Sequence, residues 1–278
     1  MQQEFKYADL LDDDVFKLVF GQESSKDVMI EFLNQVIEDR NIVDLTFIDK
    51  EMKSVNRGEK NSIYDMACDT DDGTRIVVEV QRRKQATYVE RAIYYSTFQV
   101  RNQVNAGSDD YAFCPVYVIN ILDFSLDENS GNPDVRTVYR LYEEKTHTLL
   151  TDKLTFIFLE LKKFNKTEEE LDGNILEGMY FCFRNMAKLR ARPKALAHEV
   201  FKKMFHICEL INMDELTRFK IITKMTTERD LRNQMAYAKK EAIAEGRAEI
   251  ARNLKAAGVD YAIISSATGL ALEDVEQL

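Results

Sequence analysis

The sequence predicts a domain of mixed helices and strands up to about residue 164, followed by a region that is almost entirely helical. Three observations support this prediction. A β-hairpin pattern lies at 62–83, helical and strand patterns follow one another on both sides of it, and helical patterns dominate beyond Asn165. Elements in this order are typical of α/β or α+β domains.

The first elements are predicted to be two helices and a strand. Residues 11–20 begin with acidic residues that can cap a helix and continue into apolar positions. Residues 26–40 carry apolar side chains at helical spacing. A strand is expected around 42–48, and the polar segment 53–60, which contains Gly58, is expected to be a loop.

The segment 62–83 is predicted to be a hairpin that turns at residues 71–73, Asp-Asp-Gly. Three-residue hairpin loops favour glycine at the left-handed position. With that loop, Asp65 faces Glu79 across the two strands. A slip of one residue would put the two carboxylates on opposite faces of the hairpin.

The alternation of residues gives the hairpin a polar face and an apolar face, as half-buried antiparallel strands require. The polar face is predicted to carry Asp65, Ala67, Asp69, Arg75, Val77, Glu79, Gln81 and Arg83, and the core face Tyr64, Met66, Cys68, Ile76, Val78 and Val80. Carboxylates placed directly opposite would lie about 5 Å apart at Cβ and repel each other unless a cation lies between them. A hard divalent ion such as Mg²⁺ suits such oxygen ligands. A polar face that is simply solvated is the alternative.

Residues 86–107 predict a long helix that ends at Gly107. Four-residue spacing puts Arg91, Tyr95 and Gln99 on one face of it. Either that face lines a substrate groove, or Tyr95 packs in the core while Arg91 pairs with a carboxylate. We favour the second interpretation.

Pro115 introduces an apolar strand, 115–124, that is expected to be buried on both faces. Further strands are expected at 135–143 and 154–161. The helical region then opens with a capping-box pattern at Thr167. Breaks in it are expected near Pro193, Asp214, Gly258 and Gly269, and the last break separates two short helices.

The composition is that of a soluble globular protein, with 45% hydrophobic and 31% charged residues among 278. No apolar run is long enough to span a membrane, and the N-terminus lacks a secretory signal pattern. The four cysteines have no paired spacing, so we expect buried reduced thiols and a cytoplasmic protein. The net charge of −10 argues against a large nonspecific nucleic-acid surface, although the stretch 215–255 is basic.

Several motifs together resemble the PD-(D/E)XK nuclease superfamily, and more specifically the PD-(D/E)XK nuclease family transposases, relatives of the Rpn recombination-promoting nucleases. They span nearly the whole chain in order. They are DDVFKLVFG at 13–21, YDMACDTDDGTRIVVEVQ at 64–81, RAIYYSTFQVRNQ at 91–103, PVYVINILDF at 115–124 and AEGRAEIARNLKAAGV at 244–259.

The resemblance implies an α/β fold in which helices flank a central mixed sheet, followed by a mostly helical C-terminal region. By that likeness the domains are a nuclease-like domain at 1–165, a helical region at 166–240, and a charged helical tail at 241–278 with a small helix-turn-helix-like end.

The resemblance also implies roles for individual residues. Asp65 and Glu79 would bind Mg²⁺ or Mn²⁺ with the help of the Val80 carbonyl. Asp14 would be an outer acidic residue near the metal or its water. Gln81 stands where the superfamily usually has lysine, and it offers only neutral hydrogen bonds. The residues that could contact phosphate are Lys17, Arg83, Lys84 and Arg91.

The function that these features predict is metal-dependent DNA cleavage by an endonuclease linked to mobile elements or recombination. The alternative is a noncatalytic protein that keeps the nuclease fold and acts in DNA binding or assembly. Cutting both strands of a duplex would favour a homodimer.

Overall fold

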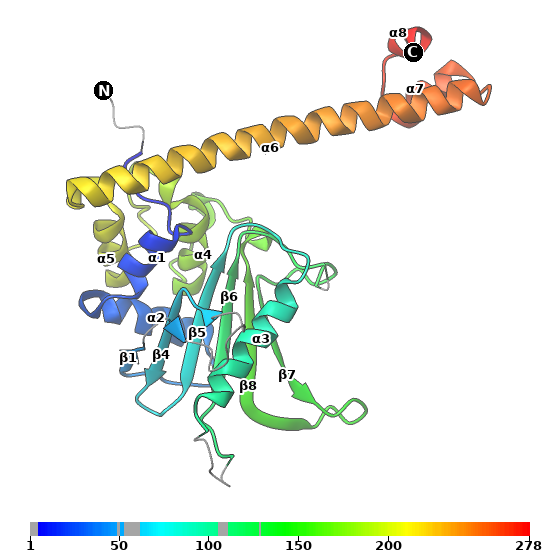
Figure 1. Ribbon diagram of the computed structural model, residues 1–278. Coiled ribbons are helices and arrows are strands. Elements are labelled where there is room, and N and C mark those ends of the chain that lie inside the picture. The colour runs from blue at the N-terminus through cyan, green and yellow to red at the C-terminus, as the bar shows by residue number, and fades with distance from the viewer. Residues whose placement is uncertain (1–4, 49–50, 53–61, 105–110, 128) are drawn as a thin grey trace. The chain divides into compact units, whose positions relative to one another are not determined.

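A six-stranded mixed sheet forms the centre of the first part of the chain (Figure 1). The computed structural model describes residues 5–48, 51–52, 62–104, 111–127 and 129–278. The strands lie in the order β1 (Leu45–Phe47), β4 (Met66–Thr70), β5 (Arg75–Gln81), β6 (Val116–Leu122), β8 (Leu149–Glu160) and β7 (Arg136–Tyr142). β6 is parallel to β5 and β8, and the other pairs are antiparallel, which confirms the mixed sheet. A separate pair joins β2 (Glu51–Met52) and β3 (Ser62–Ile63).

The β4–β5 hairpin has the predicted register. Met66 pairs with Val78 and Asp69 pairs with Arg75. Gly73 adopts φ +81° at the turn, a conformation that costs glycine little and other residues much more. The Gly73 amide donates to the Thr70 carbonyl at 2.9 Å and so closes the turn.

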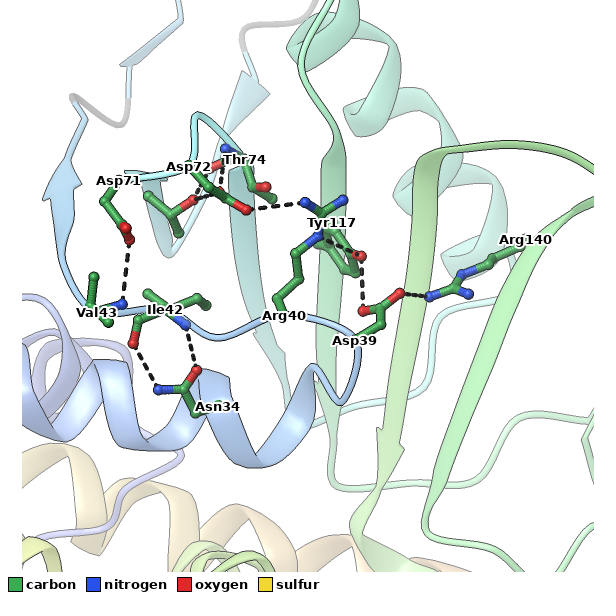
Figure 2. Close-up of polar contacts among 11 residues, drawn as sticks. Asn34, Asp39, Arg40, Ile42, Val43, Asp71, Asp72, Thr74, Tyr117 and Arg140 are labelled. Atoms are coloured by element: carbon green, nitrogen blue, oxygen red, sulfur yellow. Dashed lines mark hydrogen bonds and ion pairs between the residues drawn. The ribbon is translucent and has the colours of Figure 1, made fainter.

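A chain of polar contacts anchors this turn to the rest of the sheet (Figure 2). The Asp72 carboxylate accepts hydrogen bonds from the Thr74 amide at 3.0 Å and from Arg40 Nη1 at 3.0 Å. Arg40 Nε also donates to the hydroxyl of Tyr117 on β6 at 3.3 Å. The Tyr117 hydroxyl in turn donates to Asp39, which pairs with Arg140 on β7. The turn is therefore tied to β6 through Tyr117 and, through Asp39, to β7 at the edge of the sheet.

Helices cover the sheet. They are α1 (Asp13–Phe20), α2 (Lys26–Val36), α3 (Tyr88–Arg101), α4 (Ile175–Asn185) and α5 (Glu199–Cys208). α1, α2, α4 and α5 pack on one another around a cluster of rings, in which Phe20 lies 5.4 Å from Phe32 and 5.7 Å from Phe183. α3 covers the sheet face that carries Ala67 and Val77, through Tyr95. The alternative of a polar face that is simply solvated is therefore wrong, because α3 covers that side of the hairpin.

The helical breaks fall where the sequence predicted them. α6 (Glu215–Ala256) follows Asp214, whose carboxylate accepts from the Thr217 amide at 3.0 Å. Gly258 and Gly269 adopt φ of +78° and +72°. They separate α6 from α7 (Tyr261–Thr268) and α7 from α8 (Leu272–Gln277), so the two short terminal helices are confirmed.

The chain groups into two compact units, residues up to Ile221 and Ile222–Leu278. This grouping differs from the predicted boundaries at 165 and 240, because α4 and α5 pack against α1 and α2. The second unit has a small core of its own, which consists of Ala251, Ile264 and Val275. None of the helices in the described ranges is both long and apolar enough to cross a membrane.

Three local predictions need correction. The capping box at Thr167 is present, but it caps a single 3-10 turn, and α4 begins later under the cap of Asn174. Cys114 is exposed, whereas the other three cysteines are buried. Tyr64 packs against Tyr95 of α3 rather than on the Met66 side of the hairpin, because the chain has left the regular strand before β4 begins. Segment 53–60 and Gly107 lie outside the described residues.

Replacement of Gly73 by alanine is expected to lower the free energy of unfolding by about 1–2 kcal/mol, because alanine is strained at positive φ. The new Cβ would also lie 3.4 Å from Cys114 Sγ. Urea unfolding measures the change. Gly131→Ala is the matched control, since no described atom lies within 4 Å of its new Cβ. Equal stabilities for the two variants would contradict this account of the turn.

Candidate functional site

Two carboxylates face each other where the hairpin opens. Continuing the β4–β5 register by one residue places Asp65 opposite Glu79. Asp65 lies immediately before β4, and its Oδ2 accepts a hydrogen bond from the Val80 amide at 2.7 Å. The Asp65 side chain thus takes the place of the backbone acceptor that a longer β4 would have provided. This bond fixes Asp65 against β5.

The Glu79 carboxylate is almost completely buried, at 3% exposure. Its Oε2 accepts a hydrogen bond from Arg91 Nη2 of α3 at 3.1 Å. Its Oε1 is buried too, and no described residue donates a hydrogen bond to it. Buried carboxylate oxygens in native proteins nearly always have a hydrogen-bond donor or an ion as partner, so this oxygen is a candidate ligand for a cation.

Helix α1 brings two more charged groups to the pair. The carboxyl of Asp13 lies close enough to that of Asp65 to favour its protonated form. Lys17, one turn further along, pairs with Asp13 at 2.8 Å and lies close enough to Asp65 to favour its charged form. Asp13 was not among the residues predicted for the site, although its spacing of four from Lys17 makes the two neighbours on one helix face. Asp14 instead pairs with Lys220 at 3.0 Å.

Both carboxyls of the facing pair hold their protons unusually tightly. The pKa of Asp65 is raised to about 7, chiefly by burial and then by the neighbouring carboxyl of Asp13, while the Val80 amide and Lys17 oppose the shift. The pKa of Glu79 is raised to about 8, chiefly by burial and then by the charge of Asp65, while Arg91 opposes the shift. A bound cation would favour the charged forms of both carboxyls.

The remaining predicted residues lie at the end of β5 and beyond it. The Gln81 amide donates to the backbone carbonyl of Arg83 at 3.0 Å. Lys84 pairs with Asp127 at 2.5 Å. Arg82 bonds to Asp9 and to the Leu11 carbonyl and so ties β5 to the segment before α1. Arg82 and Lys84 are thus both engaged in ion pairs.

The face of α3 that carries Arg91, Tyr95 and Gln99 packs towards the sheet. Arg91 pairs with Glu79, and the Tyr95 ring packs 5.2 Å from that of Tyr64. Gln99 is completely buried. Arg91 therefore pairs with a carboxylate as expected, whereas Tyr95 is only partly buried and packs against the edge of a core cluster.

The donor atoms fit a magnesium-like ion. The Thr70 amide donates to the Thr74 carbonyl, so every second residue of β5 from there on, Val80 included, points its N–H and carbonyl towards β4. The Val80 carbonyl therefore faces the same side as its bond to Asp65. In the described part of the chain, no group of three or more His, Cys, Asp and Glu side chains could hold a metal. Mg²⁺ does not require one, because it commonly takes one or two carboxylates and completes its shell with water and substrate phosphate.

Comparison with known proteins adds one finding. A family model described as PD-(D/E)XK nuclease family transposase matches residues 10–238, well over half of the chain. No curated protein and no solved structure matched. The matched range contains α1, the hairpin and α3, and hence every side chain of the site described above.

The metal-free protein is expected to lose stability as the pH rises from about 4 to about 8. Over this range the folded protein holds protons on Asp65 and Glu79 that the unfolded chain has already released, and the free energy of unfolding falls wherever the folded state binds more protons. Asp65→Asn keeps an acceptor for the Val80 amide and removes one charge. It should raise the free energy of unfolding at pH 8 by on the order of 1 kcal/mol and change it little at pH 4.

Urea unfolding in EDTA at the two pH values measures this difference. Asp152→Asn, at an exposed position of β8, is the control and should leave both values unchanged. A destabilised Asp65→Asn protein at pH 8 would show that the two carboxylates are not in conflict.

Proposed function

The chain belongs to the PD-(D/E)XK nuclease family transposases, and from that membership we propose that it is a metal-dependent DNA endonuclease, which hydrolyses phosphodiester bonds. The observation that carries this function is the pair of facing carboxylates, the half-buried Asp65 and the buried Glu79, with one oxygen of Glu79 left without a donor among the described residues. Such an arrangement is costly unless it serves to bind a cation.

Asp65, Glu79 and the Val80 carbonyl would hold Mg²⁺ or Mn²⁺. Such an ion lowers the pKa of its bound water and polarises the scissile phosphate. Asp13 and Lys17 adjust the charge on Asp65 from α1. We propose that Asp14, in the first turn of α1, is an outer acidic residue near the ion or its water.

Gln81 follows Glu79 on the same face of β5, where the superfamily usually has lysine. Its amide can donate to a phosphate oxygen, and its carbonyl can accept a hydrogen bond from water. Because it carries no charge, the positive potential for the phosphate must come from elsewhere. Lys17, Arg83, Lys84 and Arg91 are the proposed sources.

The name of the family links the protein to mobile elements. We propose hydrolysis rather than strand transfer, and a relation to the Rpn recombination-promoting nucleases. The proposed substrate is DNA. Two cuts across a duplex require two active sites, so we further propose a homodimer.

Plasmid DNA incubated with the full chain is expected to be nicked or linearised in Mg²⁺ or Mn²⁺ and to stay intact in EDTA. Asp65→Asn and Glu79→Gln should each lower the rate of cleavage by at least about 100-fold, because each removes a charged ligand of the ion. Asp152→Asn is again the control and should cleave like the wild type. Gel electrophoresis over time gives the rates.

The same experiment tests the alternative function. DNA binding without cleavage by the wild-type protein, together with no stabilisation by Mn²⁺, would support a noncatalytic nuclease-fold protein that acts in DNA binding or assembly.

The side chain of Gln81 is expected to act directly in cleavage. Gln81→Ala should lower the rate of plasmid cleavage by about 10- to 100-fold at saturating Mg²⁺, because it removes a hydrogen-bonding group beside the reacting phosphate. Gln81→Lys should retain cleavage, since it restores the residue type usual in the superfamily. An Ala variant as fast as the wild type would assign Gln81 to structure alone.

A further inference from the structure

The two oxygens of Glu79 have different surroundings. Oε2 bonds to Arg91 Nη2 at 3.1 Å, whereas Oε1 is buried and meets no donor among the described residues. A carboxylate that is held through one oxygen has its rotation restricted, and its second oxygen is left in a defined direction. With Oε2 held by Arg91, the Glu79 carboxylate can present Oε1 to an ion.

Arg91 is itself held on several sides. Its guanidinium lies 5.1 Å from the centre of the Tyr95 ring and 6.0 Å from that of Tyr88. Its Nη1 donates to Gln85 at 3.4 Å. A guanidinium is planar, always charged and suited to aromatic faces, so these contacts fix both its place and its plane.

The rings that hold Arg91 are fixed in turn by the sheet. The hydroxyl of Tyr88 donates to Asn120 of β6 at 3.0 Å, and Asn120 is the β6 partner of Glu79 in the parallel register. Tyr95 packs on Tyr64, whose hydroxyl donates to the Tyr95 carbonyl at 3.0 Å. The position of Arg91 therefore follows from the same strands that carry Glu79.

We propose that Arg91 is a positioning residue of the metal site, which grips Oε2 of Glu79 so that Oε1 stays turned towards the divalent cation. This inference rests on the proposed function, since it concerns the same site. The guanidinium is engaged with Glu79, so Arg91 contributes positive potential from this ion pair and not through a direct contact with the substrate. The positive charge of Arg91 also offsets part of the repulsion between the two facing carboxylates.

The test measures Mn²⁺ binding to the full chain without DNA, by titration calorimetry. Arg91→Gln should weaken Mn²⁺ binding by about 10- to 100-fold, as is typical when a partner of a metal ligand is removed. Arg91→Lys should lose less, because an ammonium can still donate to Oε2 but lacks the fixed fork of a guanidinium. Arg101→Gln, an exposed arginine on the same helix, is the matched control and should bind like the wild type.

Circular dichroism at the titration temperature checks that each variant is folded. Arg91→Met, which keeps an unbranched side chain between the two tyrosine rings, replaces Arg91→Gln if the latter does not fold. In cleavage, the Mn²⁺ concentration for half-maximal rate should rise by a similar factor, while the rate at saturating Mn²⁺ falls less. A purely structural arginine would leave the Mn²⁺ affinity of the folded variant unchanged.

The possible failures are distinguishable. Wild-type affinity in a folded Arg91→Gln or Arg91→Met variant overturns the positioning role and leaves the nuclease function standing. Tighter Mn²⁺ binding overturns it as well, because Arg91 would then compete with the cation for Glu79. A wild-type protein that neither binds Mn²⁺ nor cleaves DNA overturns the proposed function and this inference together.

Discussion

The register of the β4–β5 hairpin is the constraint on which the rest of the site depends. Side chains in a strand alternate between faces, so a slip of one residue would move Asp65 away from Glu79 altogether. The turn resists such a slip in two ways. Gly73 provides the positive φ that a short loop needs, and Asp72 is bonded to the turn itself and to Arg40. Contacts at one end of the sheet thus fix the geometry at the other end.

The site is built at a cost to stability. Facing carboxylates destabilise one another, and burial makes their charged forms more costly still. The fold offsets part of this through the Val80 amide on Asp65 and through Arg91 on Glu79. It does not offset all of it, since Glu79 Oε1 has no donor from the described residues. A local conflict of this kind is typical of functional sites, where stability gives way to activity.

The sequence predicts those parts of the structure that local patterns determine. The turn residues 71–73 specify the hairpin register, and the glycines at 258 and 269 specify the ends of helices. Contacts between distant segments are less accessible. Asp13 and Asp14 are adjacent acids in one motif, and only tertiary packing decides which of them meets Asp65. Likewise, no pattern within the hairpin indicates that α3 covers its polar face, because that depends on where a later helix packs.

The charges around the site bear on the role proposed for Gln81. With all three acids ionised, Asp13, Asp65 and Glu79 outweigh Lys17 and Arg91 by one negative charge. A divalent cation would turn this into one net positive charge, which matches the single negative charge of a phosphodiester. A lysine at position 81 would raise this net charge from one to two, although Arg91 and Lys17 already provide positive charge to the site. Neutral hydrogen bonding at that position is therefore consistent with a balanced site, since the positive charge enters from α1 and α3 instead.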